Sequence, residues 1–174
     1  DYNCDGKNDI FTYANGGISV YLNTSTTTLS FSLSSSQLIN SASGIGIYVS
    51  PVDIPAISDI DYDGDLDILT FDIAGGFVHY FKNKSIENYG NCNNLEYQHS
   101  DGCWGNFYEG LNTYTLNCIN CTCPPITNGS TNKIQKHAGS SLLAIDVDGD
   151  SDKDLILGDV SYNNLNLLIN GGDN

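Results

Sequence analysis

Aspartates recur at alternate positions in three short stretches of this sequence, with Asn3 and Lys7 interrupting the series in the first. The stretches read DYNCDGKND from residue 1, DIDYDGDLD from residue 59 and DVDGDSDKD from residue 146. Alternate residues around a tight turn can direct their side-chain oxygens at one point, and hard oxygen donors of this kind suit Ca²⁺. Without a cation, carboxylates gathered at short range repel one another strongly. The sequence therefore predicts about three bound Ca²⁺ ions, each in a structural role.

Each stretch supplies five candidate ligands when it is numbered from its first aspartate. Positions 1, 3, 5 and 9 offer side-chain oxygens, and position 7 offers its backbone carbonyl. The candidate metal ligands are Asp1, Asn3, Asp5, Lys7 and Asp9 in the first loop, Asp59, Asp61, Asp63, Asp65 and Asp67 in the second, and Asp146, Asp148, Asp150, Asp152 and Asp154 in the third. An acidic surface turn without an ion is the alternative, and three copies in a repeated unit argue against it. Mg²⁺ is less natural here because it prefers to keep its waters.

The segments around these loops predict strands. An EF-hand would need a bidentate Glu at position 12 and flanking helices, but position 12 is Thr12, Thr70 or Leu157. After the loops, IFTYANGGISVYLN, ILTFDIAGGFVHYFKN and LILGDVSYNNLNLLIN each read as strand, turn and strand. The turn pairs are Gly16-Gly17, Gly75-Gly76 and Asn163-Asn164, and the hairpins end at Asn23, Asn83 and Asn170. Such an internal repeat predicts an all-β fold.

The loop-plus-hairpin unit resembles the FG-GAP or VCBS-type repeat of calcium-binding β-propellers, over most of residues 1–83 and 138–172. The resemblance implies four-stranded blades, with each calcium loop between the first strands of a blade. Asn3 in place of an Asp and Ser151 in place of a loop Gly depart from the pattern. A closed propeller needs about 4–8 blades. Three units therefore predict part of a larger propeller, and closure by oligomerisation is the alternative.

We expect residues 1–174 to form one such propeller fragment with four parts. Repeat 1 spans about 1–57, repeat 2 about 58–83, a cysteine-rich loop insertion about 84–137, and repeat 3 about 138–174. The insertion explains why the second and third loops are roughly 30 residues further apart than the first and second.

The six cysteines are Cys4, Cys92, Cys103, Cys118, Cys121 and Cys123, and five of them lie in the insertion. Their even number and their clustering predict disulfides and an oxidising location. The C-x-x-C-x-C run at 118–123 could alternatively bind zinc, but no second C-x-x-C pair accompanies it. Six cysteines allow 15 pairings, so the sequence leaves the connectivity open.

The formal net charge of -15 argues against nucleic acid and anionic membrane surfaces as partners. No segment approaches the ~20 apolar residues of a membrane helix. The repeats are also similar to those of surface-exported proteins of Bacteroidota. That resemblance implies a secreted or cell-surface protein on the extracellular side of a bacterial outer membrane, exported with type IX secretion components. It also implies an unidentified protein or glycan as partner.

Sequence motifs of catalysis are absent: there is no G-x-S-x-G, no P-loop and no H-E-x-x-H. We therefore expect a module that binds or scaffolds a protein or glycan, rather than an enzyme. One alternative is a polysaccharide-degrading domain, with Glu87, Glu96 and Glu109 as free acids. Another is a surface adhesin whose insertion makes the contact. Its aromatic residues, Trp104, Phe107, Tyr108 and Tyr114, could equally form the insertion's own small core.

Overall fold

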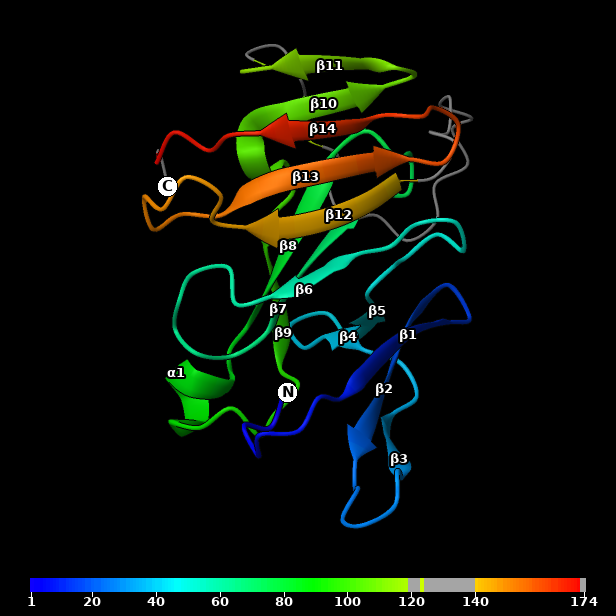
Figure 1. Cartoon of the computed structure of the whole chain (residues 1–174), viewed down its shortest axis with the longest axis vertical. Helices are drawn as coiled ribbons and strands as arrows, with labels where there is room; N and C mark the ends of the chain where they lie inside the picture. The colour runs from blue at the N-terminus through cyan, green and yellow to red at the C-terminus, as the bar shows by residue number, and fades with distance from the viewer. Residues whose placement is uncertain (119–122, 124–139, 173–174) are drawn as a thin grey trace.

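The computed structural model describes residues 1–118, 123 and 140–172, and strands dominate this part of the chain (Figure 1). Its helices are the five-residue α1 (Ser85–Tyr89) and the 3-10 turn η1 (Trp104–Asn106). The strands form three sheets and a ribbon. The fold is thus all-β, as the repeats predict.

The first sheet contains β1 (Ile10–Ala14), β2 (Gly17–Asn23) and β3 (Phe31–Ser35). The central sheet contains β6 (Ala56–Ser58), β7 (Asp67–Phe71), β8 (Val78–Asn83) and β9 (Tyr97–Asp101), and the short strands β4 (Ile39–Asn40) and β5 (Ile45–Gly46) extend it beyond β9. The third sheet contains β12 (Ser140–Ile145), β13 (Asp154–Asp159) and β14 (Leu165–Leu168). The separate ribbon pairs β10 (Phe107–Gly110) with β11 (Thr113–Leu116). All these named strand pairs are antiparallel except the parallel pair β4–β9.

Each predicted hairpin is present, and each aspartate loop precedes its first strand: β1, β7 or β13. In the central and third sheets the loop also follows a paired strand, β6 or β12. The central sheet therefore contains a complete unit of four strands, β6 to β9. Strand β9 belongs to the 84–137 segment, so part of the predicted insertion completes this unit by pairing with β8.

Local turn chemistry explains two of the hairpins. Ala14 pairs with Gly17, so the loop between β1 and β2 is Asn15-Gly16, one residue before the predicted Gly16-Gly17 pair. Both residues have positive φ, 51° and 80°, as a type I′ turn requires. Between β7 and β8, the Asp72 carboxylate accepts hydrogen bonds from the backbone N–H groups of Gly76 and Phe77 and so closes the turn.

Two hydrophobic cores hold the three sheets in a row. The core between the first and central sheets includes Ile18, Val20, Ile68, Phe81 and Tyr97. The core between the central and third sheets includes Leu69, Phe71, Tyr80, Leu142, Leu155 and Leu157. Strand β7 is buried throughout, because alternate residues serve opposite cores. Among the described residues the sheets do not close into a ring, and the first and third lie at opposite ends of the molecule (Figure 1).

Two disulfides confirm the prediction of cysteine pairing. Cys4 in the first loop bonds to Cys92, with Cα atoms 6.1 Å apart, and Cys103 bonds to Cys123, with Cα atoms 5.6 Å apart. The first bridge ties the first loop to the segment after α1. Cys121 lies outside the described residues. In the described ranges, no helix is long and apolar enough to cross a membrane.

Candidate metal centre

The last aspartate of each loop makes the same pair of backbone hydrogen bonds. One carboxylate oxygen accepts from the N–H at position 2, and the other accepts from the N–H of the asparagine that ends the hairpin. Asp9 accepts from Tyr2 (2.9 Å) and Asn23 (2.8 Å), Asp67 from Ile60 (2.9 Å) and Asn83 (2.8 Å), and Asp154 from Val147 (2.8 Å) and Asn170 (2.9 Å). The position-9 carboxylate thus fastens the start of each loop to the far end of its hairpin.

The first aspartate of each loop folds the turn itself. The Asp1 carboxylate accepts from the N–H of Gly6 at 2.7 Å, and Asp59 accepts from Gly64 at 3.1 Å. In the third loop Asp146 accepts from Gly149 at 2.6 Å and from Ser151 at 3.2 Å. These bonds bring position 6 back beneath position 1, so the loop curls around a common centre.

Positions 4 and 6 have positive φ in all three loops. The φ values are 56° and 81° at Cys4 and Gly6, 61° and 102° at Tyr62 and Gly64, and 82° and 76° at Gly149 and Ser151. The third loop therefore has its glycine at position 4 and a serine at position 6, the reverse of the other two. At Ser151 this backbone conformation is unfavourable, because an L-residue other than Asn or Asp rarely adopts it.

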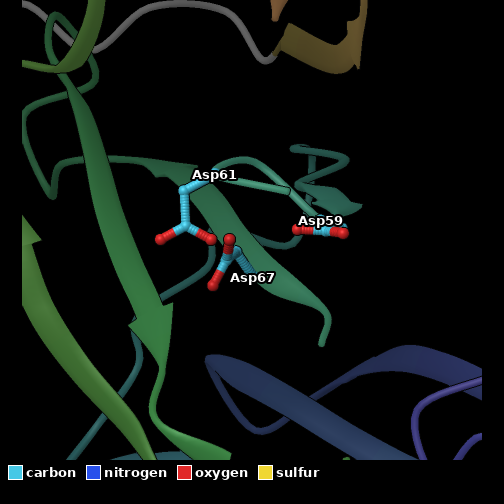
Figure 2. Close-up of side chains that lie close together, drawn as sticks. All are labelled: Asp59, Asp61 and Asp67. Atoms are coloured by element: carbon cyan, nitrogen blue, oxygen red, sulfur yellow. The ribbon is translucent and has the colours of Figure 1, made fainter. Parts of the chain in front are cut away.

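The curled loops bring three carboxylates together at two places. One oxygen from each of Asp59, Asp61 and Asp67 lies within 4.8 Å of the others, and the same holds for Asp146, Asp148 and Asp154. Figure 2 shows the Asp61 and Asp67 carboxylates close together, with Asp59 to one side. The buried Asp59 Oδ1 has no hydrogen-bond partner. Three hard oxygen donors and an unsatisfied oxygen fit a Ca²⁺ ion.

The first loop cannot form the same triad, because Asn3 stands at position 3. The Asn3 Oδ1 atom is buried without a hydrogen-bond partner, so an oxygen donor is still available there. Asp5 accepts from the N–H of Lys7 at 3.0 Å, as the equivalent Asp63 and Asp150 accept from position 7 in their loops. The three loops thus share a backbone and differ in donor charge.

The aspartates at position 7 are buried side chains, which the sequence reasoning did not foresee. It considered only the backbone carbonyls of Lys7, Asp65 and Asp152, and that role stays a prediction. Asp65 is 1% exposed, and its Oδ2 accepts from the N–H of Ile86 in α1 at 3.0 Å. Burial raises the pKa of Asp65 to about 6. Burial also raises the pKa of Asp67 to about 7, against the lowering effect of its backbone hydrogen bonds.

The second loop already has a cation beside it. The Lys82 ammonium donates to Asp61 and lies 3.2 Å from Asp63 Oδ2 and 2.7 Å from Glu87 Oε1. Desolvation raises the pKa of Glu87, but the ammonium groups of Lys82 and Lys84 outweigh it and lower that pKa to about 2. Sequence reasoning missed both Lys82 and the role of Glu87. The available signal was a lysine directly before Asn83, where the other repeats have Leu22 and Ile169.

Comparison with known families supports the repeat assignment for the first part of the chain. Residues 1–70 match the family model described as FG-GAP-like repeat. The matched residues include the first loop, its hairpin and the second loop. No curated protein and no solved structure matches the chain.

Proposed function

We propose that this chain is a calcium-binding module of propeller-type repeats whose three aspartate loops each bind one structural Ca²⁺ ion. The module works as a binding or scaffolding element for a protein or glycan. The observation that carries the proposal is the recurrence of one carboxylate triad, Asp59–Asp61–Asp67 and Asp146–Asp148–Asp154, on one backbone design. The FG-GAP-like match over residues 1–70 supports it.

Ca²⁺ would stabilise the module by removing the repulsion within each loop. Extracellular calcium modules have Kd values of about 10⁻⁴–10⁻³ M. At a free concentration of 100 Kd, one such site adds about 2.7 kcal/mol if the unfolded chain binds no metal. This gain is large against a total stability of ~5–15 kcal/mol.

Thermal unfolding in millimolar CaCl₂, in MgCl₂ and in excess EDTA tests the proposal, with bound calcium counted by elemental analysis. We expect a higher melting temperature in CaCl₂ than in MgCl₂ or EDTA, and close to three ions per chain. Asp148→Ala should remove about one ion, because it takes away the oxygen donor that an asparagine at this position would keep. Glu96→Gln removes the same charge outside the loops and should leave the count unchanged. Equal melting temperatures in the three buffers would contradict the proposal.

The same proposal includes export to the extracellular side of a bacterial outer membrane, by a type IX route. The disulfides Cys4–Cys92 and Cys103–Cys123 support an oxidising environment. Protease treatment of intact producing cells checks this location. Protection of the protein until the cells are lysed would contradict it.

A cavity favours glycan binding as the more specific form of this function. It has a volume of about 970 Å³ and lies between the second and third loops and the segment around η1. Its wall combines aromatic and polar side chains, among them Tyr62, Trp104, Asp61, Asp101, Asn106 and Lys153. Aromatic rings beside polar side chains can contact both the apolar faces and the hydroxyl groups of a sugar. The adhesin alternative uses the same wall, because Trp104 and its neighbours belong to the 84–137 segment.

Isothermal titration with soluble polysaccharides, in CaCl₂, tests this site. Tyr62 is 48% exposed, so Tyr62→Ala should weaken binding without unfolding the core. Tyr89→Ala is the matched control, because Tyr89 is 55% exposed and lies outside the cavity wall. Equal losses in both variants would argue against the cavity.

A further inference from the structure

The two terminal sheets each expose a row of apolar side chains. In the central sheet, we call the face turned toward the first sheet the leading face and the face turned toward the third sheet the trailing face. The corresponding faces of the other two sheets carry the same names. On the leading face of the first sheet, Ile10, Tyr21 and Leu33 pair in register and are 42%, 37% and 56% exposed. On the trailing face of the third sheet, Leu143, Ile156 and Leu167 pair in register, and Leu143 and Leu167 are 54% and 47% exposed.

The trailing row of the third sheet repeats a row that is buried inside the molecule. Counted from the position-9 aspartate, Ile156 corresponds to Leu69, which pairs with Ala56 and Tyr80. Ala56, Leu69 and Tyr80 belong to the core between the central and third sheets. In the central sheet, this row is therefore covered by the leading face of the third sheet.

The leading row of the first sheet has a buried counterpart as well. Ile10 corresponds to Ile68, which pairs with Phe81 as Ile10 pairs with Tyr21. Ile68 and Phe81 pack in the core between the first and central sheets, against Val20 of the first sheet's trailing face. Each internal junction thus joins a trailing face to a leading face, and the two exposed rows are the unmatched halves of one more such junction.

We propose that two copies of this chain associate head to tail, with the trailing face of each third sheet packed on the leading face of the other copy's first sheet. The two faces lie at opposite ends of one molecule, so a single copy cannot join them (Figure 1). A head-to-tail contact gives a closed ring when the rotation between copies permits it. Two copies contribute six sheets, which lies within the 4–8 blades of closed propellers.

Light scattering coupled to size-exclusion chromatography tests the proposal through the mass of the particle. The wild type should have twice the 18.8 kDa mass of one chain. Leu167→Lys disables the trailing face and Leu33→Lys disables the leading face, so each variant alone should have the mass of one chain. A 1:1 mixture should recover part of the doubled mass, because one of its two junctions joins the intact leading face of one variant to the intact trailing face of the other. Ile73→Lys, at a 47% exposed residue in the β7–β8 turn, is the control that should leave the mass doubled.

The mixture also keeps the test decisive against misfolding, since an unfolded variant cannot restore a partner. Doubled mass in only one of the single variants would show a contact between like faces and overturn the proposal. A wild type with the mass of one chain at every concentration, in CaCl₂ and in EDTA alike, would overturn it too. The proposal does not depend on calcium: one chain with three bound ions would reject this association and leave the proposed function intact.

Discussion

The second loop, residues 59–67, and the third loop, residues 146–154, gather the same triad of carboxylates on the same hydrogen-bonded backbone. They differ in what lies beside the triad. The Lys82 ammonium reaches the carboxylates of the second loop, whereas Ile169 stands at the equivalent position after the third. The two loops share the same aspartate-to-N–H bonds, and the residue before the closing asparagine determines whether an ammonium group compensates their charge.

The largest effect should come from removing the position-9 aspartates. In EDTA at neutral pH, Asp67→Ala should lower the free energy of unfolding by about 3 kcal/mol, because two buried N–H groups lose their acceptor. Asp154→Ala should cost about 2 kcal/mol, because Val147 at position 2 is 49% exposed and Ile60 only 8%. Urea titration measures both values. Equal costs below about 0.5 kcal/mol would show that metal, not these hydrogen bonds, shapes the loops.

The next prediction concerns how the stability of the metal-free protein depends on pH, which we attribute to Asp67 in the second loop. The pKa of Asp67 is about 7 in the fold against 3.8 for the unperturbed group, so the folded state binds more protons between these values. Its stabilising contribution is complete below pH ~4 and is lost as the pH rises through ~7. Urea titrations in EDTA across this range should show the decline. Asp67→Asn should flatten the profile, and an unchanged slope in that variant would assign the titration elsewhere.

Replacing the lysine beside the second loop should have a smaller effect, and this effect should be on calcium affinity. Lys82→Met should raise the calcium affinity of the second loop about tenfold, because the ion no longer competes with an ammonium group. Ile169→Lys should lower the affinity of the third loop by a similar factor. Calorimetric titration with calcium measures the affinity of both variants. Leu22→Lys makes the matching change beside the first loop. If Lys82→Met binds calcium no more tightly than the wild type, the lysine and the ion do not share the site.

The smallest effect on stability should come from changing the residue at position 6 of a loop. Ser151→Gly should stabilise the protein by about 0.5–1 kcal/mol, because φ there is +76°. Gly64→Ala should destabilise it by about 1 kcal/mol, although a Cβ at Gly64 would meet no atom within 4 Å. Paired melting curves in EDTA resolve the two shifts. Stabilisation by both changes would contradict a backbone origin.

The repeated unit was predictable from sequence because its signals are local. Aspartates at alternate positions, a turn and a closing asparagine recur in order, and the structure places loop, strand, turn and strand accordingly. The structure also assigns the closing asparagines a shared task, since the N–H of each donates to the position-9 carboxylate. Because the same elements recur in the same order along the chain, the sequence alone was enough to find them.

Features that join distant segments could not be found in this way. Glu87 approaches the second loop only because α1 follows β8, and Cys4 meets Cys92 across the boundary of two sheets. Strand β9 has the sequence YQHSD, which alternates weakly, and it enters the central sheet because β8 offers an unpaired edge. Such contacts depend on tertiary packing, which overrides local preference.

The Cys4–Cys92 bridge has a consequence for a chain that has been cut. Its two cysteines are 88 positions apart in sequence, and the span between them contains the first sheet, the connection to the central sheet and the second loop. A protease that cleaves once in any exposed turn of this span, for instance at residues 24–30, leaves both pieces covalently joined. The molecule can therefore lose the continuity of its backbone and keep its two pieces covalently joined, until a reductant cleaves the disulfide.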